Sequence, residues 1–162
     1  MEVIKIGETV PDVVFKFMGP EGLTDIKSSE LFRGKRIAAF GLPGAYTPVC
    51  SAKHLPDFVA EADELMKKQI DGIVCISVND PFVMKAWGDD HGAENKIHMM
   101  SDHQGEFTRS IGLALDLSHF GCGERSERYS MIVNDNSVES LLVEKDFLAC
   151  ELSSVESLIK VA

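Results

Sequence analysis

The sequence predicts an α/β domain with helices on both faces of a central sheet, and three observations lead to that class. Continuous apolar runs at residues 37–42 and 72–78 are typical of strands buried on both faces. Between them, apolar side chains recur at helical spacing. Farther along, two apolar segments flank an Asn-Asp-Asn turn at residues 134–136. Alternating strands and helices of this kind indicate an α/β sheet.

The first half of the chain is predicted to form two strands and two helices. Residues 13–17 are expected to be a strand, and the Gly-Pro-Glu-Gly sequence at 19–22 a turn. Residues 28–32 begin with two serines and are typical of a short capped helical turn. A strand at 37–42 follows two basic residues, and a long helix is then expected from about residue 48 to residue 68. That helix is predicted by the apolar positions Leu55, Phe58, Val59, Ala62, Leu65 and Met66.

The second half continues the alternation and ends with a hairpin and a helix. Asn79 and Asp80 are expected to cap a helix that has Pro81 in its first turn. Ser153 or Ser154 is expected to cap the last helix. The predicted elements are a strand (72–78), a helix (82–90), a strand (97–100), a helix (107–113), two hairpin strands (129–133 and 138–143) and a helix (155–161).

Length and composition exclude several classes of protein. With 162 residues the chain is expected to be one domain, residues 1–162. Its net charge of −10 argues against binding to nucleic acid or to an anionic membrane surface. The chain opens with neither a signal peptide nor any other long apolar run, and four cysteines are too few for a disulfide scaffold. A cytoplasmic location is expected, or an organelle matrix if a transit peptide has been removed.

The segment most informative for function, residues 41–51, lies where a predicted strand ends and a helix begins. Thr47 fits the N-cap and Pro48 the first helical position, which makes Cys50 the third helical residue. A sulfur there meets unpaired backbone N–H groups and the positive end of the helix dipole, and both favour the thiolate. On these residues alone, an inert buried cysteine remains an alternative.

Three stretches of the chain resemble one family closely. The spacing Pro43-x-x-x-Thr47-x-x-Cys50 matches the active-site motif of peroxiredoxins. Residues 42–58, 75–87 and 125–129 are similar to the type 5 subfamily, called type II in plants and also known as atypical two-cysteine peroxiredoxins. This resemblance covers nearly the whole chain. It implies a thioredoxin fold with a central mixed sheet and helices on both faces, and a homodimer. The implied activity is thiol-dependent reduction of hydrogen peroxide and alkyl hydroperoxides, in antioxidant defence and redox signalling, without metal or organic cofactor.

The resemblance also implies a role for each motif residue. Cys50 is the peroxidatic thiol, which attacks a peroxide oxygen and becomes a sulfenic acid. Arg128 supplies a permanent cation for the thiolate and the transition state. Thr47 contacts the thiolate and orients the peroxide, and Pro43 covers the site and limits water. Arg125 is a close rival of Arg128, and only the family's spacing favours the latter.

The four cysteines are assigned different roles. Cys150 resembles the resolving position of animal members of the subfamily, whose two cysteines pair within one chain. The alternative is that no internal partner exists and that glutathione, glutaredoxin or thioredoxin acts directly on Cys50. Cys75 is flanked by apolar residues and is expected to be an inert core thiol. Cys122, between two glycines, has no assigned role.

Three other classes of function are alternatives. A dithiol reductase usually needs C-x-x-C, and here Thr47 takes the place of the first cysteine. A metal site would use Cys50 and His54, which are four residues apart, but His98 and His103 add only a loosely spaced pair. His54 is better interpreted as a supporting residue. The third alternative is a redox sensor that relays oxidation to a partner without significant turnover.

Overall fold

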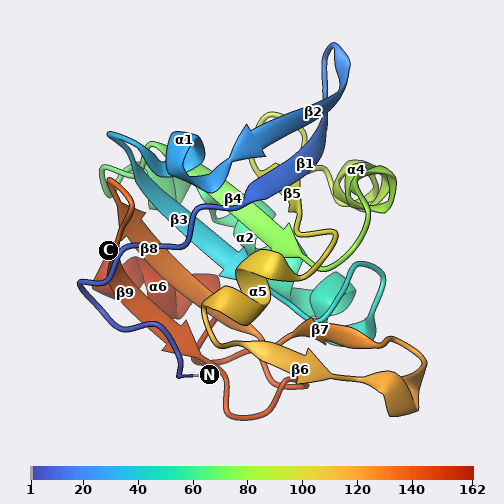
Figure 1. The fold of residues 1–162 in the computed structure, drawn as a ribbon. Coiled ribbons are helices and arrows are strands. Elements are labelled where there is room, and N and C mark those ends of the chain that lie inside the picture. Colours follow the sequence, from blue (N-terminus) through green and yellow to red (C-terminus); the bar gives the residue numbers. More distant parts are fainter. Residues whose placement is uncertain (1) are drawn as a thin grey trace.

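Seven strands form the sheet at the centre of the molecule: β1 (Val14–Gly19), β2 (Gly22–Lys27), β3 (Arg36–Gly41), β4 (Gly72–Ser77), β5 (His98–Ser101), β8 (Tyr129–Asn134) and β9 (Ser137–Val143). Their order is β2-β1-β5-β4-β3-β8-β9 (Figure 1). The three central strands β5, β4 and β3 are parallel, and the outer strands pair antiparallel with their neighbours. This computed structural model describes residues 2–162; Met1, with which the expected domain begins, lies outside the described residues.

Helices cover both faces of this sheet, which confirms the predicted fold class. They are α1 (Ser28–Phe32), α2 (Leu55–Ala60), α3 (Ala62–Met66), α4 (Pro81–Asp90), α5 (Glu106–Ser110) and α6 (Val155–Val161). Figure 1 shows α5 in front of the sheet and α2 and α6 behind it. Alternate residues of β4 enter the two cores: Cys75 packs on the side of α2 and α6, and Val74 on the side of α1 and α5.

The strand pairing brings three distant segments to one edge of the sheet. Gly41, the last residue of β3, pairs with Tyr129 at the start of the antiparallel strand β8. Tyr129 in turn pairs with Val143, the last residue of β9. The loop after β3, the residue before β8 and the segment after β9 therefore meet at this edge. Sites in open α/β sheets commonly form at such strand ends.

The long helix expected over residues 48–68 is not continuous. A π-turn, η1 (Cys50–His54), precedes α2, and Glu61 (φ −102°, ψ 12°) separates α2 from α3. Pro56 explains the π-turn, because it has no N–H to donate to the carbonyl four residues earlier and its ring crowds that carbonyl. The N–H of Leu55 instead reaches back five residues to the carbonyl of Cys50.

Other differences from the prediction lie in polar segments. Strand β2 was not predicted, because every residue in it is at least partly exposed and no apolar run marks it. A second, two-stranded sheet was also missed; it consists of β6 (Ala114–Asp116) and β7 (Glu124–Ser126), joined through the short 3₁₀ helix η2 (Ser118–Phe120). The helix expected to reach Leu113 ends at Ser110. The remaining predicted elements are confirmed within two residues at each end. Within residues 2–162, no helix is long and apolar enough to cross a membrane.

Candidate active site

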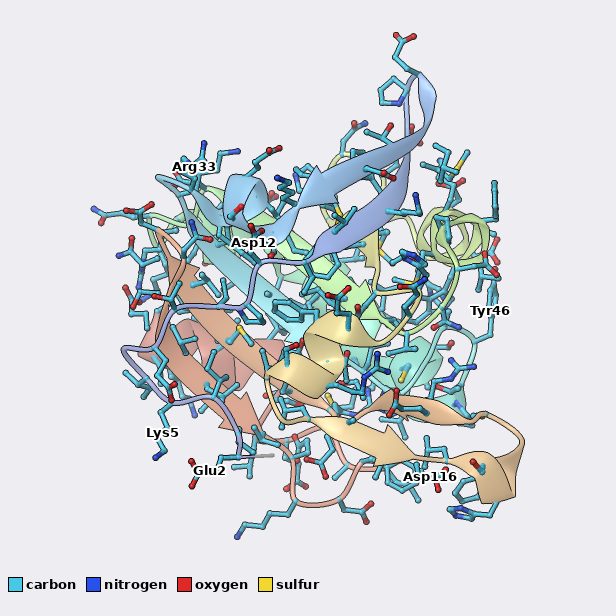
Figure 2. All side chains as sticks on the ribbon, viewed as in Figure 1. Glu2, Lys5, Asp12, Arg33, Tyr46 and Asp116 are labelled. Carbon is cyan, nitrogen blue, oxygen red and sulfur yellow. The ribbon has the colours of Figure 1, made fainter. Side chains whose placement is uncertain are left out.

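The loop between β3 and the π-turn is held by hydrogen bonds to residues at both ends of α4. The Ala45 N–H donates to Asn79 Oδ1 at 2.9 Å, and the Tyr46 hydroxyl donates to Asp90 Oδ2 at 2.6 Å. Figure 2 shows Tyr46 at the edge of the molecule, below α4. With a φ of 63°, Tyr46 adopts a left-handed conformation that is uncommon outside glycine. The surrounding contacts therefore fix a strained loop, in which Pro43 is buried.

Thr47 ends this loop and begins the helical segment. Its carbonyl accepts the Ser51 N–H at 3.0 Å, so the predicted N-cap position is correct for the backbone. The side chain differs from the prediction, because Oγ1 donates to the Gly44 carbonyl at 2.6 Å. Within the described chain, no hydrogen bond joins Thr47 Oγ1 to Cys50. Since its proton is engaged by Gly44, the Thr47 oxygen is left as an acceptor.

Cys50 is fully buried, and its sulfur lies against the guanidinium of Arg128. Arg128 Nη2 donates to Cys50 Sγ at 3.1 Å, and only 1% of Arg128 is exposed. Its Nε donates to the Phe147 carbonyl at 3.0 Å, and its Nη1 donates to His54 Nδ1 at 3.0 Å. None of these three partners is a carboxylate. Arg128 is therefore a buried cation whose three hydrogen-bond partners carry no carboxylate charge.

His54 orients the guanidinium. Because its Nδ1 accepts a hydrogen bond from Arg128, its Nε2 carries the proton and donates to the Ser153 carbonyl at 3.1 Å. Burial, together with the nearby Arg128 charge, lowers the pKa of His54 from 6.5 to about 3. The imidazole is therefore neutral under ordinary conditions, and it supports Arg128 as an acceptor.

Arg125, the alternative to Arg128, contacts the loop after β3 and not the Cys50 sulfur. Its Nε donates to the Cys122 carbonyl at 2.9 Å, and its Nη1 donates to the Pro43 carbonyl at 3.4 Å. A Cβ at Gly44 would come within 2.5 Å of Arg125 Nη1, so the glycine is needed for this close approach. Arg125 therefore supports the loop, whereas Arg128 contacts the thiol.

The other three cysteines occupy different environments, and all four are free thiols. Cys75 lies on β4 in the same core as Cys50, and burial raises the pKa of its thiol. Cys150 is buried in the segment between β9 and α6, where burial raises the pKa of its thiol to about 11. Cys122 is partly exposed in the loop between η2 and β7.

The candidate metal ligands Cys50, His54, His98 and His103 do not come together around one point. Cys50 and His54 do face a common point, but the Arg128 guanidinium occupies it. Over residues 2–162, no group of three or more His, Cys, Asp or Glu side chains is placed to hold a metal ion. His98 lies on β5 and His103 is exposed in the loop that follows.

Several supporting residues were not predicted as part of the site. Phe147 and Ser153 act through their carbonyl oxygens, so their side chains gave no signal. Asn79 was expected only as a helix cap; Asp80 takes that position, accepting the Val83 N–H at 2.8 Å, and Asn79 holds the loop instead. Trp87 Nε1 donates to Ser51 Oγ at 3.0 Å, which ties α4 to the residue next to Cys50.

A buried thiol at a helix start, in contact with a buried guanidinium at the edge of such a mixed sheet, defines a thiol-based oxidoreductase of the thioredoxin fold. The comparisons with known proteins identify the family. The redoxin family model matches residues 5–159, and the chain belongs to this family. Within the family it is a peroxiredoxin, and it is a thiol-dependent peroxidase.

Three relatives illustrate this similarity. Peroxiredoxin-2B of Arabidopsis thaliana is 42% identical over 145 residues, covering 89% of this chain and 90% of the relative. Reduced Prx3 of Vibrio vulnificus, solved in complex with hydrogen peroxide, is 40% identical with a TM-score of 0.93, covering 98% of both chains. Peroxiredoxin 5 of Alvinella pompejana is 34% identical with a TM-score of 0.85, covering 98% of this chain and 97% of that one.

Proposed function

We propose that Cys50 is the peroxidatic thiol and that it reduces hydrogen peroxide and alkyl hydroperoxides. The observation that carries this assignment is the 3.1 Å contact between Arg128 Nη2 and Cys50 Sγ. A buried guanidinium without a carboxylate partner stabilises an anion at that sulfur. The thiolate is the form of cysteine that attacks peroxides.

The reaction proceeds by in-line displacement on oxygen. The Cys50 thiolate attacks one peroxide oxygen, the O–O bond breaks, and the leaving hydroxide or alkoxide takes up a proton to give water or an alcohol. Sulfur is oxidised to the sulfenic acid and the peroxide is reduced. Three of the five N–H groups of Arg128 are used by Cys50, His54 and Phe147. The other two are available to stabilise the negative charge as it moves onto the leaving oxygen.

Thr47 and Pro43 shape the place where the peroxide binds. The Thr47 oxygen, whose proton is given to the Gly44 carbonyl, accepts a hydrogen bond from the peroxide O–H and so orients it. Buried Pro43 excludes water from one side of the loop and protects the sulfenic acid.

A second thiol returns Cys50 to its reduced form. The Cys150 thiolate attacks the sulfenic sulfur, an S–S bond replaces the S–O bond, and the hydroxide leaves as water after protonation. Burial raises the pKa of Cys150 to about 11, so this step requires the surrounding segment to open. An external thiol, from glutathione, glutaredoxin or thioredoxin, acts on Cys50 directly if Cys150 does not.

The chain also forms a homodimer through the rim of the site. Tyr46, Phe120 and Leu148 are 53%, 58% and 56% exposed. They belong to the loop after β3, to η2 and to the segment after β9. Phe120 packs on Phe147 with ring centroids 6.1 Å apart, so two of these segments are in contact. Exposed apolar side chains gathered on adjoining segments are typical of a protein interface.

The decisive experiment follows the sulfur of Cys50 after one equivalent of peroxide. Mass spectrometry of the wild type and the four single Cys→Ser variants is expected to locate the sulfenic acid on Cys50 and, in the wild type, a Cys50–Cys150 linked peptide. Persistent sulfenic acid in the wild type would exclude Cys150 as the resolving thiol. Sustained NADPH consumption with a thioredoxin or glutaredoxin system separates turnover from a sensor that is oxidised once.

A further inference from the structure

The segment between β9 and α6, residues 144–153, supports the active site at two points. The Phe147 carbonyl accepts from Arg128 Nε, and the Ser153 carbonyl accepts from His54 Nε2. Cys150 lies between these two residues on the same segment. The chain portion that holds the guanidinium in place therefore also carries the proposed resolving thiol.

Glu144 closes this segment on itself. Only 6% of Glu144 is exposed, and one of its side-chain oxygens, Oε1, accepts three hydrogen bonds from the far end of the segment. The donors are the Glu151 N–H at 2.6 Å, the Ser153 N–H at 2.8 Å and the Ser153 hydroxyl at 3.0 Å. Hydrogen bonds to a carboxylate are stronger than those between neutral groups. The backbone N–H of Glu144 meanwhile donates to the Arg128 carbonyl at 2.9 Å, which anchors the near end.

We propose that Glu144 is a positioning residue that latches the 144–153 segment and thereby decides which of two successive steps the site can perform. Closed, the latch presents the Phe147 and Ser153 carbonyls to Arg128 and His54, as peroxide reduction requires. Open, it frees Cys150 to reach Cys50 but withdraws both carbonyls. This inference rests on the proposed function, because it assigns opposite latch states to the oxidation and the resolution of Cys50.

Burial explains why Cys150 cannot act while the latch is closed. Its exposure of 6% leaves little room for attack on another sulfur, and formation of a disulfide requires the two Cα atoms to come within about 7 Å. The sulfenic acid formed on Cys50 therefore waits for the segment to open. During this wait a second peroxide can oxidise it further to the sulfinic acid.

The latch is tested first by the accessibility of Cys150, which does not depend on peroxide chemistry. In a Cys50→Ser background, Glu144→Ala is expected to speed alkylation of Cys150 by about tenfold, the effect of losing a hydrogen bond to a charged group. The matched control is Glu151→Ala, which removes the same charge from an exposed side chain on the same segment. Cys75, buried in the core, reports global unfolding.

The outcomes of this labelling experiment are distinct. Equal Cys150 labelling in the Glu144→Ala and Glu151→Ala proteins overturns the latch. If Glu144→Ala accelerates labelling of Cys75 equally, that variant is globally unfolding. The milder Glu144→Gln substitution, which keeps an acceptor oxygen without the charge, then provides the test. A severalfold rise in Cys150 labelling, with Cys75 unchanged, is then expected, and no rise overturns the proposal.

The second test measures how the sulfenic acid is partitioned in the protein with all four cysteines. Glu144→Ala is expected to slow oxidation of Cys50, to speed formation of the Cys50–Cys150 disulfide, and to lower the sulfinic fraction at a given peroxide concentration. A slower first step without faster disulfide formation would mean that Glu144 is only a structural support. If the wild type forms no such disulfide, the resolving role of Cys150 fails, and the labelling result still decides whether the latch exists.

Discussion

At the scale of single residues, the chemistry of the site depends most on Arg128. It is a buried cation whose three hydrogen-bond partners are a carbonyl oxygen, a neutral imidazole and the Cys50 sulfur. Cys50 and His54 are the first and last residues of the π-turn η1, and Phe147 lies in the segment after β9. The guanidinium fork therefore links both ends of the π-turn to the segment after β9.

Replacing Arg128 by lysine is expected to slow oxidation of Cys50 by peroxide by about 10²–10³-fold, the cost of losing a preorganised donor at a developing negative charge. Lysine keeps the positive charge but has no fork to reach all three partners. Stopped-flow measurement of the first oxidation step checks this. Arg109→Lys, at an exposed residue paired with Glu124, is the control and should react like the wild type. A wild-type rate for Arg128→Lys would remove Arg128 from the mechanism.

His54 predicts a specific acid sensitivity. Because the folded state lowers the pKa of His54 from 6.5 to about 3, the unfolded chain binds this proton more readily, and acidification favours unfolding between these two values. The stability due to the neutral imidazole is fully present above pH 6.5 and falls by up to about 1.4 kcal/mol per pH unit below it.

Urea unfolding across this pH range measures the effect. His54→Gln is expected to flatten the fall in the free energy of unfolding, although it lowers stability near neutral pH. His103→Gln, at an exposed histidine, is expected to leave the slope unchanged. An equal slope in the wild type and the His54→Gln protein would show that other groups cause the acid sensitivity.

The sequence pointed to the candidate site residues more directly than to the groups that support them. The positions of Pro43, Thr47 and Cys50 followed from a cap pattern and a family motif, both of which depend on side-chain type. The choice between Arg125 and Arg128 could not be derived from composition, because both are arginines near the same strand. The family's spacing favoured Arg128, and the structure separates the two by the 3.1 Å contact of Arg128 with Cys50 and the 3.4 Å contact of Arg125 with the Pro43 carbonyl.

At the scale of elements, the pairing of β3 with β8 fixes the backbone position of Arg128 beside the loop that leads to Cys50. Gly41 lies opposite Tyr129, the residue after Arg128, and a Cβ at Gly41 would come within 2.1 Å of the Tyr129 ring. Tyr129 is fully buried, so its ring has no open space to move into. The glycine therefore allows β8 to start directly beside the loop that leads to Cys50.

Gly41→Ala is expected to destabilise the protein by about 3 kcal/mol, as overpacking of a rigid core does, and to slow peroxide reduction because Arg128 shifts with Tyr129. Gly72→Ala is the matched control: its added Cβ meets the end of the Ile37 side chain at 3.3 Å and the His98 ring only at ordinary contact distance, 3.9 Å. Denaturant unfolding gives the two free energies. Equal stability of the two variants would contradict this account of the β3–β8 pairing.

The elements predicted correctly are those that bury a continuous or periodic apolar pattern. Strands β3 and β4 and helix α4 belong to this group. The hairpin turn was also predicted, and Asp135 and Asn136 both adopt positive φ there. The π-turn was missed because the apolar spacing around it fits a regular helix, and only Pro56 signals the extra residue. Strands β6 and β7 have too few buried side chains to leave a pattern.

At the scale of the whole molecule, the net charge of −10 contrasts with the site, where a buried arginine faces a thiol. The net charge therefore indicates which kinds of partner the surface disfavours, but it does not indicate the charge at the buried site. The proposed homodimer interface consists of the exposed apolar side chains at the rim of the site, Tyr46, Phe120 and Leu148.

Leu148→Asp is expected to weaken this dimer at least about tenfold, because a charge placed in an apolar contact is buried without a partner. Leu23→Asp makes the same change on β2, at the far side of the sheet, and is expected to leave association unchanged. Sedimentation equilibrium of the wild type and both variants measures the dissociation constant. A monomeric wild type, or equal weakening by both substitutions, would refute the proposed interface.

The hydrogen bond from Trp87 to Ser51 has a practical consequence. Trp87 is the only tryptophan in the chain, it is fully buried, and its indole N–H donates to the hydroxyl of the residue next to Cys50. Any rearrangement of the first helical turn alters the polarity around this single fluorophore. The protein therefore carries its own optical label, and its emission should change with each cycle of Cys50 oxidation and reduction without an added dye.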